Sequence, residues 1–266
     1  MITAGLDLGA KFIKVVILND GEVISRVKVY SGFEQEVSAS DALKEALNQA
    51  GLQHDEIEYI VATGVGRGIA PFKNDVLTEV GAAARGAVAR LPETRTVIDV
   101  GAEEGRAILI TPDGRVKDFA INEKCAAGSG TFTESMARAL EMDIEEFGKL
   151  ALQSDKAVPM NAQCAVFAES EVVSLLHART PKHDIARAVH DAIASRIVSM
   201  ARRVSVEKQV MIIGGMAYNV GFIASMKRAL EMDIVLPDYP DFVPAEGAAW
   251  AAHDKLVGRE KIEAEG

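Results

Sequence analysis

The sequence predicts an α/β fold made of two related domains. The chain has 266 residues, 48% of them hydrophobic, which is enough apolar material for two modest cores. Short β-branched segments alternate with helical patterns along the whole length, as in folds that pack helices on sheets. One arrangement occurs twice: a strand that ends in Asp-x-Gly and then a hairpin, at 7–9 and again at 99–101. This internal repeat indicates two domains with the same architecture.

The first copy of the repeat lies near the N-terminus. Asn19, Asp20 and Gly21 form a strong hairpin signal between two apolar, β-branched segments. Further on, Gly51 ends a helical pattern of alanines and leucines, and Pro92 interrupts a second, alanine-rich helix. The expected elements are strands at 2–9, 11–20 and 21–30, a helix at 38–51, a strand at 56–67 and a helix at 79–91.

The second copy starts directly after Pro92. The segment 94–121 repeats the strand, the Asp-x-Gly turn and the hairpin, with Pro-Asp-Gly at the hairpin turn. The elements expected after it are helices at about 130–141, 143–152, 165–178 and 184–206, a strand at 208–219, and helices at 221–232 and 246–256. No low-complexity linker separates the halves, so we expect closely packed domains. The expected domains are 1–94 with 246–266, and 95–245.

Composition and charge narrow the functional class. The net charge of −10 contains no block of like charge, which argues against a nucleic-acid partner. No apolar segment reaches the roughly 18 residues that a membrane span needs, and the N-terminal segment lacks the pattern of a secretory signal. Two cysteines do not make a disulfide framework. We therefore expect a cytoplasmic protein without a membrane span.

The two Asp-x-Gly turns predict phosphate chemistry. A turn that contains glycine brings backbone N–H groups close to a phosphate, because no Cβ blocks the approach. Asp7 and Asp99 could each hold a phosphate-bound Mg²⁺ through water. A late strand that ends in Gly214-Gly215 adds a third glycine site, and the sequence has no Walker-type phosphate loop. Together these features predict a nucleotide cleft between the two domains.

Three segments resemble the motifs of a known ATPase superfamily. GLDLGAKFIKVVIL at 5–18 and VIDVGAEEGRAI at 97–108 are similar to the two phosphate motifs of the actin, hexokinase and heat-shock-chaperone ATPases. IIGGMAYNVG at 212–221 is similar to their adenosine motif. The resemblance implies an α/β fold of two duplicated actin-like ATPase domains, of the ribonuclease H-like type, around a nucleotide cleft.

Three further segments resemble a narrower group within that superfamily, the BadF/BadG/BcrA/BcrD-type ATPases. They are ATGVGR at 62–67, NEKCAAGSGTF at 122–132 and CAVFAESEVVSLL at 164–176. This family comprises activators of 2-hydroxyacyl-CoA dehydratases and ATPase subunits of benzoyl-CoA reductase. The resemblance runs from residue 3 to about 254 and implies binding of ATP or ADP with Mg²⁺.

The resemblance also implies a set of site residues. Asp7 and Asp99 would hold Mg²⁺, and Glu103 or Glu104 would position the attacking water. The residues expected to bind the nucleotide are Gly9, Ala10, Lys11, Lys14, Gly101, Ala102, Gly214 and Gly215. Phosphoryl transfer depends chiefly on positioning and on neutralising charge, so we expect the Mg²⁺ ligands to matter most.

The chain departs from the usual activator pattern in both phosphate motifs. Typical activators have DxGSTxxK, whereas Ala10 and Lys11 stand here at the hydroxyl positions. The second motif is typically DxGGQD, whereas Glu103 and Glu104 replace its Gln and Asp. GAEEGRAI is more similar to the D-type ATPase component of benzoyl-CoA reductase. The sequence therefore favours a subunit of that heterodimeric reductase, with a homodimeric dehydratase activator as the alternative.

Cys125 and Cys164 are the only cysteines of the chain. Each precedes a predicted helix, where free N–H groups and the helix dipole favour a thiolate, although buried inert cysteines are common. The resemblance implies that both are metal ligands, because family members are dimers that share one [4Fe–4S] cluster between two subunits. It further implies a second ATPase subunit, a ferredoxin-like electron donor, and a reductase or dehydratase component that accepts low-potential electrons.

Two alternatives of other classes stay open. One is a small-molecule kinase of the same superfamily whose cysteines are inert. The other is a nucleotide-binding scaffold that does not hydrolyse ATP, which the departures at Ala10, Lys11 and Glu103 make conceivable. The spacing of His177, His183 and His190 does not match a metal-binding pair, and we expect all three on the surface.

Overall fold

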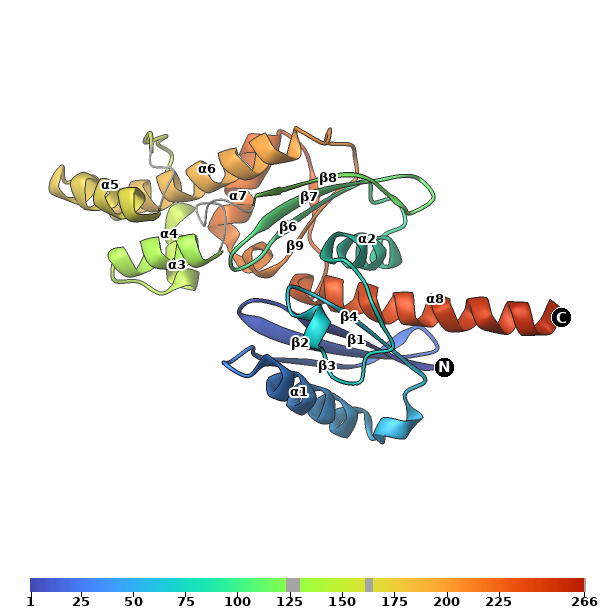
Figure 1. Cartoon of the computed structure of the whole chain (residues 1–266). Helices are drawn as coiled ribbons and strands as arrows, with labels where there is room; N and C mark the ends of the chain where they lie inside the picture. Colours follow the sequence, from blue (N-terminus) through green and yellow to red (C-terminus); the bar gives the residue numbers. More distant parts are fainter. Residues whose placement is uncertain (123–129, 161–164, 266) are drawn as a thin grey trace. The chain divides into compact units, whose positions relative to one another are not determined.

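The computed structural model describes residues 1–122, 130–160 and 165–265 (Figure 1). Contacts divide the chain into two units. Unit 1 comprises Met1–Thr94, Ile110–Val116 and Phe242–Gly266, and unit 2 comprises Arg95–Leu109 and Lys117–Asp241. Compared with the ranges expected from the sequence, unit 1 also takes in 110–116, and its C-terminal part starts at Phe242 instead of residue 246.

Unit 1 contains a mixed five-stranded sheet in the order β3-β2-β1-β4-β5. Its strands are β1 (Ile2–Leu8), β2 (Phe12–Asn19), β3 (Glu22–Tyr30), β4 (Tyr59–Thr63) and β5 (Asp75–Val76). Its helices are α1 (Gln35–Ala50), η1 (His54–Glu56), η2 (Arg67–Ile69), α2 (Glu79–Arg90) and α8 (Val243–Glu265). Strand β1 runs antiparallel to β2 and parallel to β4, so it is the central strand of the sheet.

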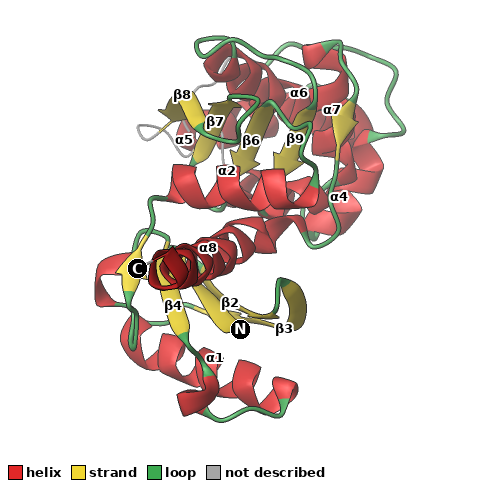
Figure 2. Cartoon of the chain, turned by 90° about the vertical axis from the view of Figure 1, so that its right-hand side faces the viewer, coloured by secondary structure: helices red, strands yellow, loops and turns green. Residues whose placement is uncertain are grey.

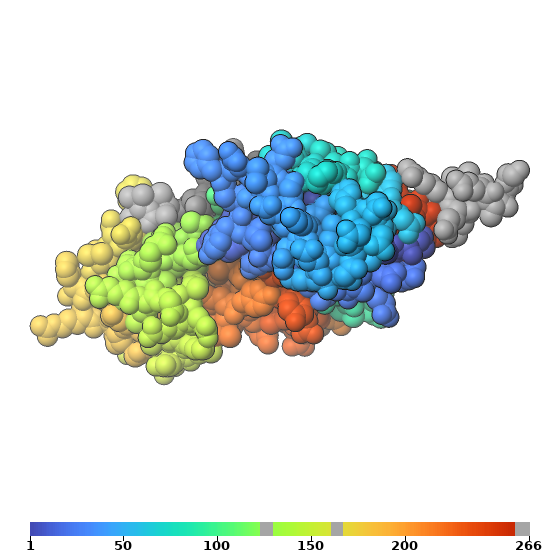
Figure 3. Space-filling view, turned by 90° about the horizontal axis from the view of Figure 1, so that it is seen from below, coloured from blue at the N-terminus to red at the C-terminus, as the bar shows by residue number. Residues whose placement is uncertain are grey.

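Helices cover both faces of this sheet. Helix α1 packs against β1, β2 and β3, whereas α8 packs against β1, β2 and β4, and α2 lies on α8. Figure 2 shows α1 and α8 on opposite sides of the strands, and α1 with its neighbouring segments forms the part of unit 1 that faces the viewer in Figure 3. Because both faces are covered, six of the seven β1 residues are buried.

The hairpin turn and the end of the first helix of unit 1 form where the sequence predicts them, and the structure adds a cap for the second helix. Asp20 and Gly21 both have positive φ, 49° and 85°, which is the backbone of a tight primed hairpin turn. Gly51 ends α1 in the left-handed conformation with φ 68°. Thr78 caps α2 by accepting the Gly81 N–H.

Unit 2 contains a second mixed sheet in the order β10-β9-β6-β7-β8, which repeats the strand directions of the first. Its strands are β6 (Thr96–Val100), β7 (Gly105–Ile110), β8 (Val116–Asn122), β9 (Val210–Ile213) and β10 (Ile234–Val235). Its helices are α3 (Gly130–Ala139), α4 (Ile144–Ala151), α5 (Ala165–His177), α6 (Lys182–Ala201), η4 (Gly215–Tyr218), α7 (Val220–Leu230) and η5 (Pro240–Phe242), the last of which ends at the first residue of unit 1.

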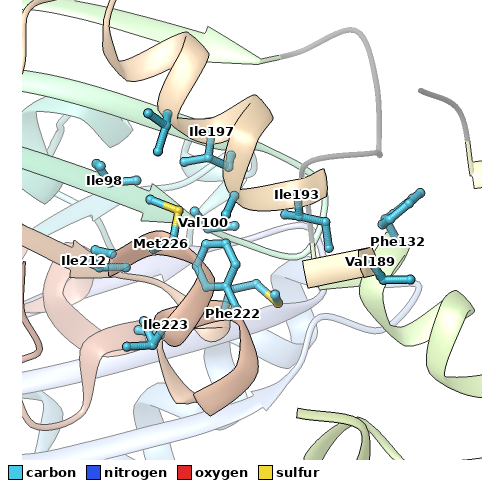
Figure 4. Close-up of a cluster of buried hydrophobic side chains, with 14 of the residues drawn as sticks. Ile98, Val100, Phe132, Val189, Ile193, Ile197, Ile212, Phe222, Ile223 and Met226 are labelled. Carbon is cyan, nitrogen blue, oxygen red and sulfur yellow. The ribbon is translucent and has the colours of Figure 1, made fainter. Parts of the chain in front are cut away.

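The core of unit 2 lies between its sheet and helices α6 and α7. Figure 4 shows Ile98 and Ile212 from the sheet beside Ile197 of α6 and Phe222 of α7, and all four are fully buried. Phe132 of α3 extends this cluster toward the shorter helices. No helix in the described part of the chain is long and apolar enough to cross a membrane.

Several element boundaries differ from the sequence expectation. Helix α8 begins at Val243 because Pro244 fits in the first turn of a helix, where its missing N–H costs nothing. Helix α6 ends at Ala201 instead of residue 206, and the φ of 65° at Ser205 is incompatible with a helix that continues through that residue. The strands β5 and β10 were not expected, because two residues carry too little pattern to predict a strand.

The surface location expected for the three histidines is wrong for His190. His177 is exposed and His183 half-buried, but His190 has no exposed surface. Its ring packs 4.8 Å from the Phe147 ring, and its Nδ1 lies 2.7 Å from the Ala186 carbonyl oxygen. Burial lowers the pKa of His190 to about 4, against the opposing effect of that carbonyl.

We predict that His190 makes folding stability depend on pH. An unfolded histidine takes up its proton near pH 6.5, whereas folded His190 resists protonation down to about pH 4. Stability is therefore intact above pH 6.5 and falls as the pH is lowered through this window, by about 3 kcal/mol at most. Urea unfolding between pH 7 and pH 4 should show a flatter pH dependence for His190→Gln, whereas His177→Gln, the exposed control, should follow the wild type. Equal slopes for wild type and His190→Gln would contradict the assignment.

Candidate functional site

A glycine turn follows the first strand of unit 1. The Gly9 N–H donates to the Phe12 carbonyl over 3.1 Å and closes the β1–β2 turn. Ser31 Oγ donates to the Gly9 carbonyl over 2.7 Å, which ties the turn to the end of β3. A Cβ on Gly9 would lie 2.8 Å from the Phe12 carbonyl oxygen, so this position requires glycine. Of the other turn residues, Ala10 is exposed, and Lys11 Nζ lies 5.6 Å from the Phe12 ring centre.

An ion pair lies beside this turn. Asp7 and Lys14 are direct partners in the antiparallel β1–β2 ladder. Lys14 Nζ donates to Asp7 Oδ2 over 2.9 Å, and the two side chains are only 13% and 10% exposed. The register of the hairpin therefore brings two predicted site residues together where solvent screens their charges weakly.

Unit 2 repeats this geometry with a larger set of charges. The Gly101 N–H donates to the Glu104 carbonyl over 2.9 Å and closes the β6–β7 turn. Asp99 and Arg106 are partners in the β6–β7 ladder, and Arg106 Nη1 donates to Asp99 Oδ2 over 3.3 Å. Arg106 Nη2 donates to Glu104 Oε2 over 2.6 Å. Glu103 is the exposed residue of this turn.

Sequence reasoning missed Arg106. A signal was available, because Arg106 follows Asp99 by the same interval that separates Lys14 from Asp7. Both hairpins have turns of equal length, so the same interval places both cations opposite the acid in the ladder. Arg106 is thus the unit 2 counterpart of Lys14.

One glycine stands against each of the two aspartates. Gly64 directly follows β4, the parallel neighbour of β1, and Gly214 directly follows β9, the parallel neighbour of β6. Their φ angles are 89° and 87°. A Cβ on Gly64 would lie 2.5 Å from the Leu8 carbonyl oxygen and 2.6 Å from Asp7 Oδ1. A Cβ on Gly214 would lie 2.4 Å from the Val100 carbonyl oxygen and 2.6 Å from Asp99 Oδ1. Gly64 was not predicted as a site residue, because its role depends on which strand pairs with β1.

A buried hydroxyl lies next to the first of these glycines. Thr63 is the ladder partner of Asp7 in the parallel β1–β4 pair and has no exposed surface. Its Oγ1 has no hydrogen-bond partner within the described part of the chain. Such a buried polar atom is usually satisfied by water or by a ligand.

The predicted adenosine segment forms a braced loop in unit 2. The Gly214 N–H donates to the Pro240 carbonyl over 3.0 Å, and Gly215 begins the short helix η4. Tyr218, at the end of η4, donates its hydroxyl proton to Asp241 Oδ1 over 2.8 Å. Burial and the Asp241 carboxylate raise the pKa of Tyr218 above its ordinary value, so the hydroxyl remains a donor.

Of the remaining predicted residues, Ala102 lies in the unit 2 turn and the two cysteines fall outside the described part of the chain. The Ala102 carbonyl accepts the Thr131 N–H over 2.9 Å and the Thr131 hydroxyl over 2.6 Å, which joins the unit 2 turn to α3. Cys125 and Cys164 lie outside the described residues. Within the described ranges, no three His, Cys, Asp or Glu side chains gather as a metal site.

The repeated mixed sheets define an α/β fold of the actin-like ATPase class. A ROK-family glucokinase from Streptomyces griseus has the same fold, with a TM-score of 0.57 and 15% identity over 96% of this chain and all of that chain. At the level of sequence, the chain belongs to the BadF/BadG/BcrA/BcrD ATPase family, which it matches over residues 4–252. This confirms the family resemblance of the phosphate, adenosine and cysteine segments.

The similarity to individual members of this family covers nearly the whole chain. The activator of the 2-hydroxyisocaproyl-CoA dehydratase from Clostridium difficile, solved with bound ADPNP, has a TM-score of 0.92 and 35% identity, over 98% of this chain and 97% of that chain. The activator of lactoyl-CoA dehydratase from Anaerotignum propionicum is 36% identical, over 96% of this chain and 98% of its own. The D-type component of benzoyl-CoA reductase from Thauera aromatica is 31% identical, over 98% of each chain.

These comparisons favour the dehydratase-activator alternative over the benzoyl-CoA reductase subunit that the sequence motifs favoured. The GAEEGRAI segment favoured a benzoyl-CoA reductase subunit, but identity over the full length is higher to the two dehydratase activators. One turn contributes few positions to such a comparison, whereas the full-length match samples both domains. The dehydratase-activator alternative therefore fits the comparisons better.

We predict that Gly64→Ala and Gly214→Ala each destabilise their unit by more than about 2 kcal/mol, because left-handed strain and overpacking each cost about 1–3 kcal/mol. Gly68 and Gly215 are the controls, since neither has a positive φ and a Cβ on either would meet no atom within 4 Å. Thermal and urea unfolding of the four single variants checks this. Losses as large at Gly68 and Gly215 would show that the general cost of replacing glycine, and not the positive φ and crowding at Gly64 and Gly214, explains the effect.

Proposed function

We propose that the chain is an ATP-hydrolysing activator of a 2-hydroxyacyl-CoA dehydratase, acting as a dimer with a shared [4Fe–4S] cluster. The observation that carries this proposal is the full-length similarity to two such activators, one of them solved with a nucleotide analogue. The two aspartate-glycine sites support the ATPase part, because their residue types suit a hydrated cation and phosphate oxygens.

The described residues fit Mg²⁺ and phosphate on two grounds. Asp7 and Asp99 supply carboxylate oxygens, the donors that Mg²⁺ takes, usually through water. The buried Thr63 hydroxyl adds a polar atom that a bound water could satisfy.

The residue roles follow from this fit. Asp7 and Asp99 would hold Mg²⁺, which when bound would neutralise the charge that develops on the phosphates. The glycine turns and Lys14 hold the phosphates, and the loop braced by Tyr218 meets the adenosine. The proposed nucleotide-binding residues are Gly9, Ala10, Lys11, Lys14, Gly101, Ala102, Gly214 and Gly215.

The electron-transfer part of the proposal is carried by the two cysteine segments. Cys125 and Cys164 of one chain, with the same pair from a second subunit, would give the four thiolates that a [4Fe–4S] cluster takes. The cluster supplies a one-electron carrier at low potential. A ferredoxin-like protein would reduce it, and the dehydratase component would accept the electron.

A second candidate is a benzoyl-CoA reductase subunit that pairs with a different ATPase subunit. It is favoured by one observation, the two glutamates at 103 and 104 in the second phosphate motif. Co-expression decides between the candidates. A dehydratase activator is active as a homodimer together with its dehydratase. The reductase subunit is active only in a heterodimer with the different ATPase subunit.

We predict that Asp99→Asn lowers ATP hydrolysis by two or more orders of magnitude, about 3 kcal/mol or more in activation free energy, with a smaller loss of ATP affinity. The charge of Asp99 acts mainly on the transition state, so turnover should suffer more than binding. Phosphate release by the assembled complex measures the first quantity and ADPNP titration the second. Asp155→Asn, an exposed residue of the same unit, is the control. Survival of full hydrolysis in Asp99→Asn would remove Asp99 from the site.

We predict that protein purified without air is brown and carries about half a cluster per chain, since one cluster takes four thiolates. Cys125→Ala and Cys164→Ala should each remove the iron and the electron paramagnetic resonance signal and weaken the dimer, but leave ADPNP binding intact. Iron analysis, spectroscopy and sedimentation provide the measurements. Full iron content in either variant would make the cysteines inert and favour the kinase alternative, which phosphoryl transfer to a small molecule would reveal.

A further inference from the structure

The two copies of the hairpin site differ in how the cation is held. In unit 1, Lys14 approaches Asp7 with a single ammonium group over 2.9 Å. In unit 2, the Arg106 guanidinium spans two carboxylates, with Nη1 3.3 Å from Asp99 Oδ2 and Nη2 2.6 Å from Glu104 Oε2. The contact to Glu104 is the shorter of these two, so Glu104 takes part in fixing the guanidinium beside Asp99.

The geometry of arginine makes this anchor effective. A guanidinium is planar and rigid, so a contact that fixes one nitrogen also orients the other. The Arg106 and Asp99 side chains are only 9% and 8% exposed, and solvent therefore screens their attraction weakly. A displacement of Glu104 would be transmitted through Arg106 to the Asp99 carboxylate.

We infer that Arg106 is a positioning residue for Asp99 and that Glu104 acts on the site only through Arg106. This inference rests on the proposed ATPase function and deepens it. Glu104 is committed to an ion pair, whereas Glu103 is exposed and makes no hydrogen bond or ion pair within the described part of the chain. Of the two glutamates predicted to orient the attacking water, Glu103 is the one whose carboxylate is available.

The inference predicts a specific split between turnover and binding. A misplaced Mg²⁺ ligand reduces the rate because the transition state needs the geometry most, and a shift of about 1 Å can cost about 100-fold. Arg106→Lys keeps the positive charge, but a single ammonium group cannot contact the Asp99 and Glu104 carboxylates with two separate nitrogens as the guanidinium does. Glu104→Gln keeps the shape but loses the charge that anchors the guanidinium.

The test is a double-mutant cycle with Arg106→Lys, Glu104→Gln and the double variant, measured on the full complex. Each single change should lower kcat for ATP hydrolysis by about 10-fold to 100-fold and leave the Kd for ADPNP within about threefold. The double variant should be no worse than the poorer single variant, because both changes break one linkage. Glu103→Gln should lower kcat by the same factor whether it is introduced into the wild type or into the Arg106 and Glu104 variants. Glu145→Gln, which removes an exposed ion pair with Lys149, is the control.

Failure of the Arg106 inference and failure of the proposed ATPase function give different results. If the fall in kcat of the double variant equals the product of the two single falls, Glu104 has a role that is independent of Arg106, and the inference is overturned. Unchanged kcat in folded Arg106→Lys, or a fall in ADPNP affinity as large as the fall in kcat, would also overturn it. If Glu104→Gln fails to fold, Glu104→Asp, which shortens the reach to Arg106, replaces it in the cycle. Wild-type complex that releases no phosphate overturns the proposed function itself.

Discussion

In each unit a buried carboxylate near the end of the first strand determines which residues can lie around it. Asp7 and Asp99 are 7% and 6% exposed, and a carboxylate at that depth needs a cation close by. The antiparallel hairpin supplies Lys14 or Arg106 in direct register. At the end of the parallel strand beside it stands a glycine with positive φ, where a Cβ would crowd both the carboxylate and the backbone carbonyl of the following residue. Each buried carboxylate is thus enclosed by a cation from the hairpin and a glycine from the neighbouring parallel strand.

Unit 1 adds a second constraint, the close packing of the C-terminal helix. A Cβ on Gly5 of β1 would collide with the Ala245 carbonyl of α8, and a Cβ on Gly247 of α8 would collide with the Ala82 carbonyl of α2. Glycine at both positions lets three backbones approach one another directly. Charge reinforces this packing, because Glu246, 2% exposed, accepts from Arg26 of β3 and from Arg90 of α2. Removing one member of such a buried set typically costs about 3–5 kcal/mol.

The two units carry similar sites that differ in the groups around the cation. Both units keep the aspartate, the cation and the glycine turn. Only unit 2 adds a second carboxylate on the cation, with an exposed glutamate beside it. In the proposed ATPase both units bind phosphate and Mg²⁺, and this asymmetry gives unit 2 the additional task of positioning the attacking water. The family match and the full-length similarity to dehydratase activators are consistent with that division.

The sequence by itself determined the α/β class, the repeat, the family and the turns, because these depend on local signals. Asp20 with Gly21 and the terminal Gly51 act through their own backbone angles, whatever surrounds them. It also singled out the two aspartates and Lys14, since the motif spacing carries them. Only the tertiary structure decided which residues meet them. Gly64 lies against Asp7 because β4 pairs with β1, and Arg106 bridges Asp99 and Glu104 because of the hairpin register. His190 is buried because α4, α6 and α7 pack together, which no pattern of histidine spacing encodes. Such contacts join residues distant in the chain, and their energies depend on burial that exists only after folding.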